Sequence, residues 1–81
     1  MSKTEKLIAR FKTKPKDFTW DEMISLLNYF GYEEIRGSGS RRKFIHDNCH
    51  LIILHKPHPR KILKIYQIEQ VYAILTEENL L

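Results

Sequence analysis

Hydrophobic residues recur at helical spacing most clearly in one segment of the chain. This segment follows Thr19-Trp20-Asp21-Glu22, which has the form of a capping box at the start of a helix, and it ends at Gly31. Its apolar positions are spaced i, i+3, i+4 and i+7, and they are Met23, Leu26, Leu27 and Phe30. This stripe predicts an amphipathic helix that packs its apolar side into the core.

Two further helices are predicted, one on each side of this segment. Ser2-x-x-Glu5 is another capping box, and the apolar spacing behind it predicts a short helix over about residues 3–12. Residues 65–76 repeat a helical stripe near the other end of the chain. Pro15 disfavours helix at Lys14, so we interpret residues 12–18 as a linker. We expect the N-terminal helix to be solvated and loosely docked, with a functional role as the alternative.

Three short segments between the second and third helices have the composition of β-strands. They cover residues 32–36, 41–46 and 50–55, and Asp47-Asn48 supplies a tight turn between the last two. Sequential strands with tight connections predict an antiparallel meander. Alternation along the middle strand places Phe44 inward together with Arg42 and His46, and it leaves Arg41 and Lys43 on the solvent face.

These elements predict an α+β fold. We expect a small three-stranded antiparallel sheet with the last two helices packed on one face, in the order α-β-β-β-α, plus an extra N-terminal helix. A chain of 81 residues has room for one folded domain. We divide the chain into an N-terminal helical arm, residues 1–16, and a main domain, residues 17–81.

The net charge of +4 conceals a division of the chain into basic and acidic blocks. Residues 1–16 hold six basic side chains and one acidic one, and residues 36–64 hold eight basic and one acidic. Residues 17–35 and 65–81 hold no Lys or Arg. A surface that only confers solubility intersperses the two signs, so this pattern favours a basic face directed at nucleic acid. An acidic protein partner is compatible with the same pattern.

Composition disfavours several other classes of protein. No apolar run approaches the roughly 20 residues that span a bilayer, and we expect a soluble cytoplasmic protein without a membrane partner. The single cysteine, Cys49, permits no internal disulfide and fits a reducing compartment. His46, His50, His55 and His58 lack helical or zinc-knuckle spacing, so we expect no metal and no small-molecule cofactor.

The candidate chemistry concentrates in the stretch from Gly37 to Phe44, which reads Gly-Ser-Gly-Ser-Arg-Arg-Lys-Phe. Glycine keeps the backbone open there, and three consecutive cations follow on an extended segment, which suits a phosphate-bearing partner. The strand at residues 50–55 leads into a basic exit loop that reads His55-Lys56-Pro57-His58-Pro59-Arg60-Lys61. The two segments therefore bring cations to neighbouring strands, and the exit loop adds His55 and His58.

Three sets of residues stand at the joints between the predicted elements. They are Leu26-Leu27-x-x-Phe30-Gly31-Tyr32, Gly39-Ser40 followed by Phe44, and Pro57-His58-x-x-Lys61-x-Leu63-Lys64. In this order and spacing, over about residues 19–81, they resemble the HicA toxins of bacterial and archaeal toxin–antitoxin pairs. The resemblance implies a fold like that of double-stranded-RNA-binding domains and the activity of an mRNA interferase, a ribosome-independent endonuclease. It also implies a HicB-type antitoxin that covers the active surface.

One position departs from the family pattern. The family's usual signature is Gly-Ser-His at the start of the second strand, where the histidine carries RNA cleavage, whereas the matching triplet here is Gly39-Ser40-Arg41. Arginine stays protonated, so Arg41 is suited to stabilise negative charge but not to transfer protons. Histidine titrates near neutral pH, and the catalytic candidates are therefore His58 and His55, followed by His46.

The sequence leaves three functions open. The first is an mRNA-cleaving hydrolase of the HicA type, the second is a non-catalytic RNA-binding module that has lost the family histidine, and the third is a protein-interaction domain that meets an acidic partner. For the first two functions, the residues expected to bind RNA lie in the glycine-rich stretch and beyond the exit loop. They are Ser38, Ser40, Arg41, Arg42, Lys43, Lys61 and Lys64.

Overall fold

The computed structural model describes residues 3–37, 39–57 and 59–81. Its helices and strands lie within one or two residues of the predicted segments, and the predicted α+β class is confirmed. In chain order the elements are α1 (Lys3–Lys12), α2 (Trp20–Tyr29), β1 (Glu33–Arg36), β2 (Arg41–His46), β3 (Cys49–His55) and α3 (Ile65–Glu77). Ser38 and His58, both named as candidate site residues, lie outside the described residues.

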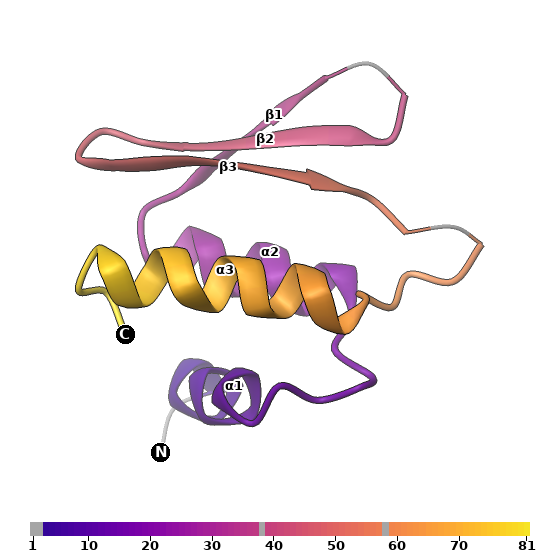
Figure 1. Ribbon diagram of the computed structural model, residues 1–81, viewed down its shortest axis with the longest axis horizontal. Coiled ribbons are helices and arrows are strands. Elements are labelled where there is room, and N and C mark those ends of the chain that lie inside the picture. Colours follow the sequence, from indigo (N-terminus) through magenta and orange to yellow (C-terminus); the bar gives the residue numbers. More distant parts are fainter. Residues whose placement is uncertain (1–2, 38, 58) are drawn as a thin grey trace.

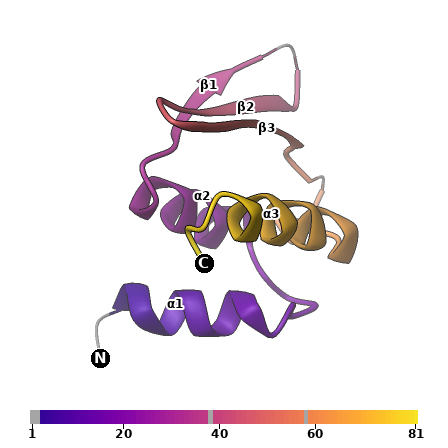
Figure 2. The same cartoon turned by 60° about the vertical axis from the view of Figure 1, so that its left-hand side comes forward.

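The elements form three layers. The sheet has the order β1-β2-β3 with both pairs antiparallel, as a meander requires. Helices α2 and α3 lie side by side against one face of the sheet, and α1 lies on the far side of these two helices (Figure 1 and Figure 2). The other face of the sheet, which we call the outer face, carries no helix (Figure 1). Its residues are Glu33, Ile35, Arg41, Lys43, Ile45, Leu51, Ile53 and His55.

Local signals at both ends of α2 explain its boundaries. The backbone N–H of Glu22 donates to Thr19 Oγ1 at 3.1 Å and the N–H of Thr19 donates to Glu22 Oε1 at 3.0 Å, which completes the capping box. After the helix, Gly31 adopts a φ of +94°, and a Cβ at this position would lie 2.9 Å from His46 Nε2. Glycine is therefore required at this turn for both conformation and space.

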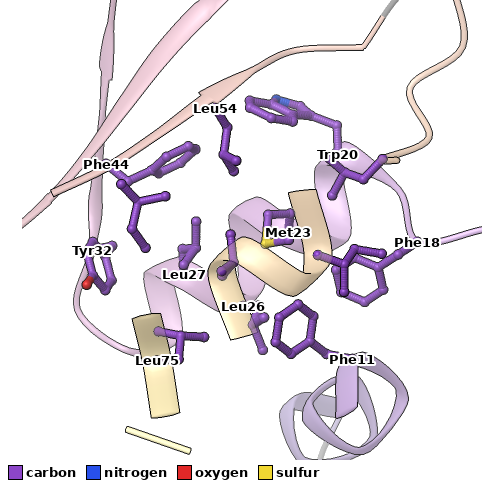
Figure 3. Close-up of a cluster of buried hydrophobic side chains, with 14 residues drawn as sticks. Phe11, Phe18, Trp20, Met23, Leu26, Leu27, Tyr32, Phe44, Leu54 and Leu75 are labelled. Carbon is purple, nitrogen blue, oxygen red and sulfur yellow. The ribbon is translucent and has the colours of Figure 1, made fainter. Parts of the chain in front are cut away.

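A single hydrophobic core joins the sheet to the helices (Figure 3). Phe44 on β2 is fully buried, and its ring centroid lies 5.9 Å from that of Trp20 at the start of α2. Arg41 and Lys43, the neighbours that alternate with Phe44, are exposed, which confirms the predicted alternation. Leu80 and Leu81 pack at the edge of this core after α3 ends.

The expectation that the N-terminal helix is loosely docked is wrong. Phe11 is fully buried, with ring centroids 5.5 Å from Phe18 and 5.9 Å from Tyr72. Arg10 Nε donates to Glu22 Oε2 at 2.9 Å. Desolvation acts to raise the pKa of Glu22, but hydrogen bonds from Arg10 and Thr19 outweigh it, and the pKa lies below its ordinary value. Phe11 and Phe18 are seven residues apart and meet only because the chain turns between them, so local spacing did not reveal this contact.

The chain that leaves β3 is fixed beside the start of α2. The N–H of Trp20 donates to the carbonyl of Lys61 at 2.8 Å, and the N–H of Leu63 donates to the carbonyl of Phe18 at 2.9 Å. These two bonds flank an antiparallel bridge between Thr19 and Ile62. The exit segment, the linker after α1 and the first turn of α3 are thereby brought to one edge of the molecule.

Candidate functional site

Arg41 and His55 face each other across two strands at one end of the β2–β3 hairpin. They are direct partners in the register, and both belong to the outer face of the sheet. Directly opposed residues of an antiparallel pair have Cβ atoms about 4.5–5.5 Å apart, so the guanidinium and the imidazole can reach the same small ligand. The structure thus places His55 directly opposite Arg41, the third residue of the Gly39-Ser40-Arg41 triplet.

The backbone around this pair is well supported. The carbonyl of Ser40 accepts a hydrogen bond from the N–H of Lys56 at 2.8 Å, which extends the ladder one step beyond Arg41 and His55. The N–H of Gly37 donates to the carbonyl of Arg41 at 3.0 Å and closes the turn between β1 and β2. Arg41 is therefore held at the start of a strand rather than on a free loop.

The side chains of the three consecutive cations of β2 do not all lie on the same face of the sheet. Arg42 lies on the inner face, where its guanidinium donates to the carbonyls of Gly39 at 2.7 Å and Arg41 at 3.0 Å. Its Nε lies 3.7 Å from Glu34 Oε2, and only 15% of its side chain is exposed. Lys43 lies on the outer face between Ile35 and Ile53. In this structure Arg42 secures the turn, while Arg41 and Lys43 face solvent.

A cavity of about 510 Å³ opens beside His55. Three segments line it: the linker after α1, the exit loop of β3 and the first turn of α3. We call it the basic cavity, and its described residues are Lys16, His55, Lys56, Pro57, Pro59, Arg60, Ile62, Lys64, Tyr66 and Gln67. Four of these carry a positive charge and none carries a negative one, so the cavity is suited to an anion.

Gln67 fixes the geometry between His55 and α3. Its side chain is buried, with 4% of the residue exposed. Its Oε1 accepts from the N–H of Lys64 at 2.9 Å, and its Nε2 donates to the carbonyl of His55 at 3.0 Å. One amide thus ties the end of β3 to the start of α3. The sequence analysis did not identify Gln67, although a glutamine three residues after a helix start is a typical capping signal.

The other histidines lie at the opposite end of the hairpin. His46 pairs with Cys49, accepts a hydrogen bond at Nδ1 from the N–H of Asn48 at 3.0 Å and packs edge-on against Tyr32. His50 Nδ1 contacts the carboxylate of Glu78, just after the end of α3. The structure therefore separates His46, the third catalytic candidate, from Arg41 and His55.

Cys49 is not activated as a nucleophile. Burial, followed by a hydrogen bond with Glu78, raises the pKa of its thiol, which keeps the thiol protonated at neutral pH. Burial also raises the pKa of the neighbouring Tyr32 to about 12. Its hydroxyl donates to the carbonyl of His50 at 3.0 Å. These groups tie this end of the hairpin to Tyr32, before β1, and to Glu78, just after α3.

Neither a metal site nor a membrane segment is present in the part of the chain that the structure describes. No three His, Cys, Asp or Glu side chains gather closely enough there to bind a metal ion. Within residues 3–37, 39–57 and 59–81, no helix has the length and apolar character needed to cross a bilayer.

The remaining candidates are placed as follows. Lys64 lies in the basic cavity, whereas Lys61 is exposed and is not among the described lining residues. Ser40 is half-buried beside Arg41. Lys16 and Tyr66 line the cavity but were not identified from the sequence. The clustering of basic residues in the N-terminal block was the one signal that pointed towards Lys16.

Comparison with known proteins places most of this fold in one family. A family model described as the HicA toxin of bacterial toxin–antitoxin matches residues 20–76, which run from the start of α2 almost to the end of α3. No curated protein and no solved structure matches the chain.

Proposed function

The chain belongs to the HicA toxin family, and it is therefore the toxin of a toxin–antitoxin system with an antitoxin as its partner; we propose that it acts in the cytoplasm by binding and cleaving mRNA without the ribosome. The observation that carries this proposal is the pairing of Arg41 with His55 beside a cavity whose described lining residues include cations and no acids. It joins a group that can transfer protons to groups that can hold phosphate.

Metal-free cleavage of RNA needs both kinds of group. The 2′-hydroxyl oxygen bonds to the adjacent phosphorus while the bond from phosphorus to the 5′-oxygen breaks, which leaves a 2′,3′-cyclic phosphate and a 5′-hydroxyl. A base removes the 2′-hydroxyl proton, an acid protonates the departing 5′-oxygen, and cations stabilise the charge on phosphorus. We assign proton transfer to His55 and charge stabilisation to Arg41, with His58 as the second proton-transfer candidate.

The donors present are consistent with cleavage that needs no metal ion. Four exposed or half-buried cations lie near His55. Two of them, Arg41 and Lys43, are on the neighbouring strand, and the other two, Lys56 and Lys64, line the basic cavity with His55. Arginine and lysine bind phosphate oxygens through N–H donors and need no cofactor to do so. We therefore propose that Arg41, Lys43 and Lys64 contact RNA, together with Ser40, Lys61 and the undescribed Ser38. Arg42 contributes by supporting the turn that carries Arg41.

The proposed antitoxin is of the HicB type and covers the outer face of the sheet. Ile35, Ile45 and Leu51 are each 38–48% exposed on this face, next to Arg41 and Lys43. Apolar side chains that stay exposed beside a functional site are typical of a protein interface. An antitoxin bound there would shield Arg41 and His55 from RNA.

A second function, a non-catalytic RNA-binding module, is favoured by one observation. The position of the family's cleaving histidine is occupied by Arg41, which cannot serve as a base at neutral pH. In that case the same cations bind RNA and leave it intact.

Incubation of the purified protein with RNA decides between the two functions. We expect fragments ending in 2′,3′-cyclic phosphate, detected by end-group analysis. Replacing both His55 and His58 by Ala should lower the cleavage rate by about 10²–10⁴-fold, the usual contribution of general acid–base catalysis. His50→Ala is the matched control, because it removes a histidine at the other end of the hairpin. Full cleavage by the double variant contradicts the assignment of proton transfer, and tight binding without any cleavage by the wild type supports the second function.

A further inference from the structure

One wall of the basic cavity comes from outside the part of the chain that the family model matches. Lys16 belongs to the N-terminal arm, whereas the match begins at residue 20. Lys56, Arg60 and Lys64 line the rest of the cavity from the exit loop and from the start of α3. Four like charges around one opening repel each other, and an anion bound among them relieves that repulsion.

The position of Lys16 is set by the folded structure of the arm. Phe11 anchors the arm in the core, and Arg10 Nη2 donates to Asp17 Oδ1 at 2.9 Å on the other side of Lys16. Between them Lys14 adopts a φ of +52°, and its Nζ lies 5.1 Å from the centroid of the Tyr72 ring. Lys16 is therefore held at the cavity by contacts on both sides along the chain.

Tyr66 adds an aromatic surface to the same cavity. It lies in the first turn of α3 and is 61% exposed, although it is a large ring with apolar faces. An exposed aromatic ring next to several cations is the arrangement that proteins use to stack an unpaired base while they hold its phosphates.

We infer that the basic cavity binds one nucleotide of single-stranded RNA, with Lys16 and its neighbouring cations on the phosphate and Tyr66 stacked on the base. This inference rests on the proposed function, since it assigns the RNA strand to a place beside His55. It makes the N-terminal arm a part of the RNA site.

Single-stranded RNA fits these residues better than a duplex does. In an A-form helix the faces of the bases are stacked on each other, so a ring such as Tyr66 has no base to meet. The volume of about 510 Å³ also lies within the range of about 300–1,000 Å³ that is usual for small-molecule pockets, which suits one nucleotide.

The contribution of Lys16 is tested by binding at several salt concentrations. The probe is a short single-stranded RNA with 2′-fluoro groups, which cannot be cut by attack of a 2′-hydroxyl, and binding is read by fluorescence anisotropy. Lys16→Ala should weaken binding several-fold and reduce the slope of log affinity against log salt by about 0.7, the value for one phosphate contact on a single strand. Lys12→Ala removes the same charge from an exposed residue of α1 that is not among the lining residues, and it should change both quantities less.

The contribution of Tyr66 is tested in the same assay. Tyr66→Ala should lower the affinity by about 5- to 100-fold, as for other stacked bases, whereas Tyr66→Phe should retain most of it. Equal affinities for wild type, Lys16→Ala and Tyr66→Ala overturn the inference but leave the proposed function intact. A wild-type protein that binds no RNA overturns both. Variants that lose antitoxin binding but keep RNA binding also overturn the inference, because the cavity would then serve the protein partner.

Discussion

The two ends of the β2–β3 hairpin carry similar residues in different surroundings. At one end His55 faces Arg41 and borders a cavity with four cations and no acid. At the other end His46 accepts a hydrogen bond from the turn, and His50 pairs with Glu78. Each end thus has a histidine at or next to the end of a strand. At the first end the charged residues among the described cavity lining are all cations, whereas at the second end the histidines contact a backbone N–H and a carboxylate.

This difference teaches that the partners of a histidine, more than its presence, indicate its role. A histidine that is bonded to a backbone N–H or a carboxylate within the fold is engaged in holding the structure together. A histidine beside cations at an open cavity can lie next to a bound phosphodiester and transfer a proton to or from the oxygens that react there. We call the His55 end the chemical end, because the proposed cleavage assigns proton transfer to it, and we call the His46 end the structural end.

The largest expected effect concerns the chemical end. In a His55→Ala background, the further change Arg41→His places an imidazole directly across the hairpin from the lost one and restores the family's Gly-Ser-His triplet. We expect cleavage to recover by about 10²-fold or more, because the lost contribution is that of a general base. The measurement is the initial rate of RNA cleavage by the single and double variants.

The matched control for this experiment is Lys43→His in the same background. Lys43 also lies on the outer face of β2, but it pairs with Ile53 instead of His55. Recovery with Lys43→His as large as with Arg41→His would mean that any added histidine suffices, which contradicts a defined chemical end.

A smaller effect is expected from the glycines of the two ends. Gly31→Ala introduces a Cβ 2.9 Å from His46 Nε2 at a φ of +94°, and we expect a loss of about 1–3 kcal/mol in the free energy of unfolding. Gly39→Ala is the control, because Gly39 also has a positive φ, +58°, but no atom lies within 4 Å of its added Cβ. Urea unfolding of both variants measures the difference. Equal losses would show that His46 is not packed closely against the turn.

The smallest effect concerns Tyr32, and it is a loss of stability that appears only in alkaline solution. Burial raises its pKa to about 12, above the ordinary value of 10 in the unfolded chain, so folding favours the neutral phenol. The stability that this provides is present below pH 10 and is lost as the pH rises from 10 to about 12. Unfolding in urea at pH 8 and pH 11 should show a larger decrease for wild type than for Tyr32→Phe. The same decrease in both proteins would contradict a raised pKa at this position.

Most of the fold was predictable because its signals are local. The capping box at Thr19, the stripe along α2 and the alternation around Phe44 each depend on residues within one turn or one strand. The docking of α1 was not predictable in this way. It depends on the meeting of Phe11 with Phe18 and Tyr72, and Tyr72 is sixty-one positions further along the chain.

The candidate site was predictable in its residue types but only partly in its arrangement. The block of cations identified Arg41, Lys43 and Lys64, and the chemistry of arginine directed attention to His55. Three consecutive cations suggested one binding surface, yet alternation turns Arg42 towards Glu34. Lys16, Tyr66 and Gln67 come together through long-range contacts such as the bridge between Thr19 and Ile62, which no local pattern reveals.

All four residues of β1 are exposed, so this strand adds little to the hydrophobic core. Because the turn that presents Arg41 lies between β1 and β2, substitutions in it remove few buried contacts. Proteins tolerate new residues most readily where the loss of stability is small. Since the side chain of Arg41 is itself exposed, we expect substitutions at position 41 to change the chemistry of this surface while the protein still folds.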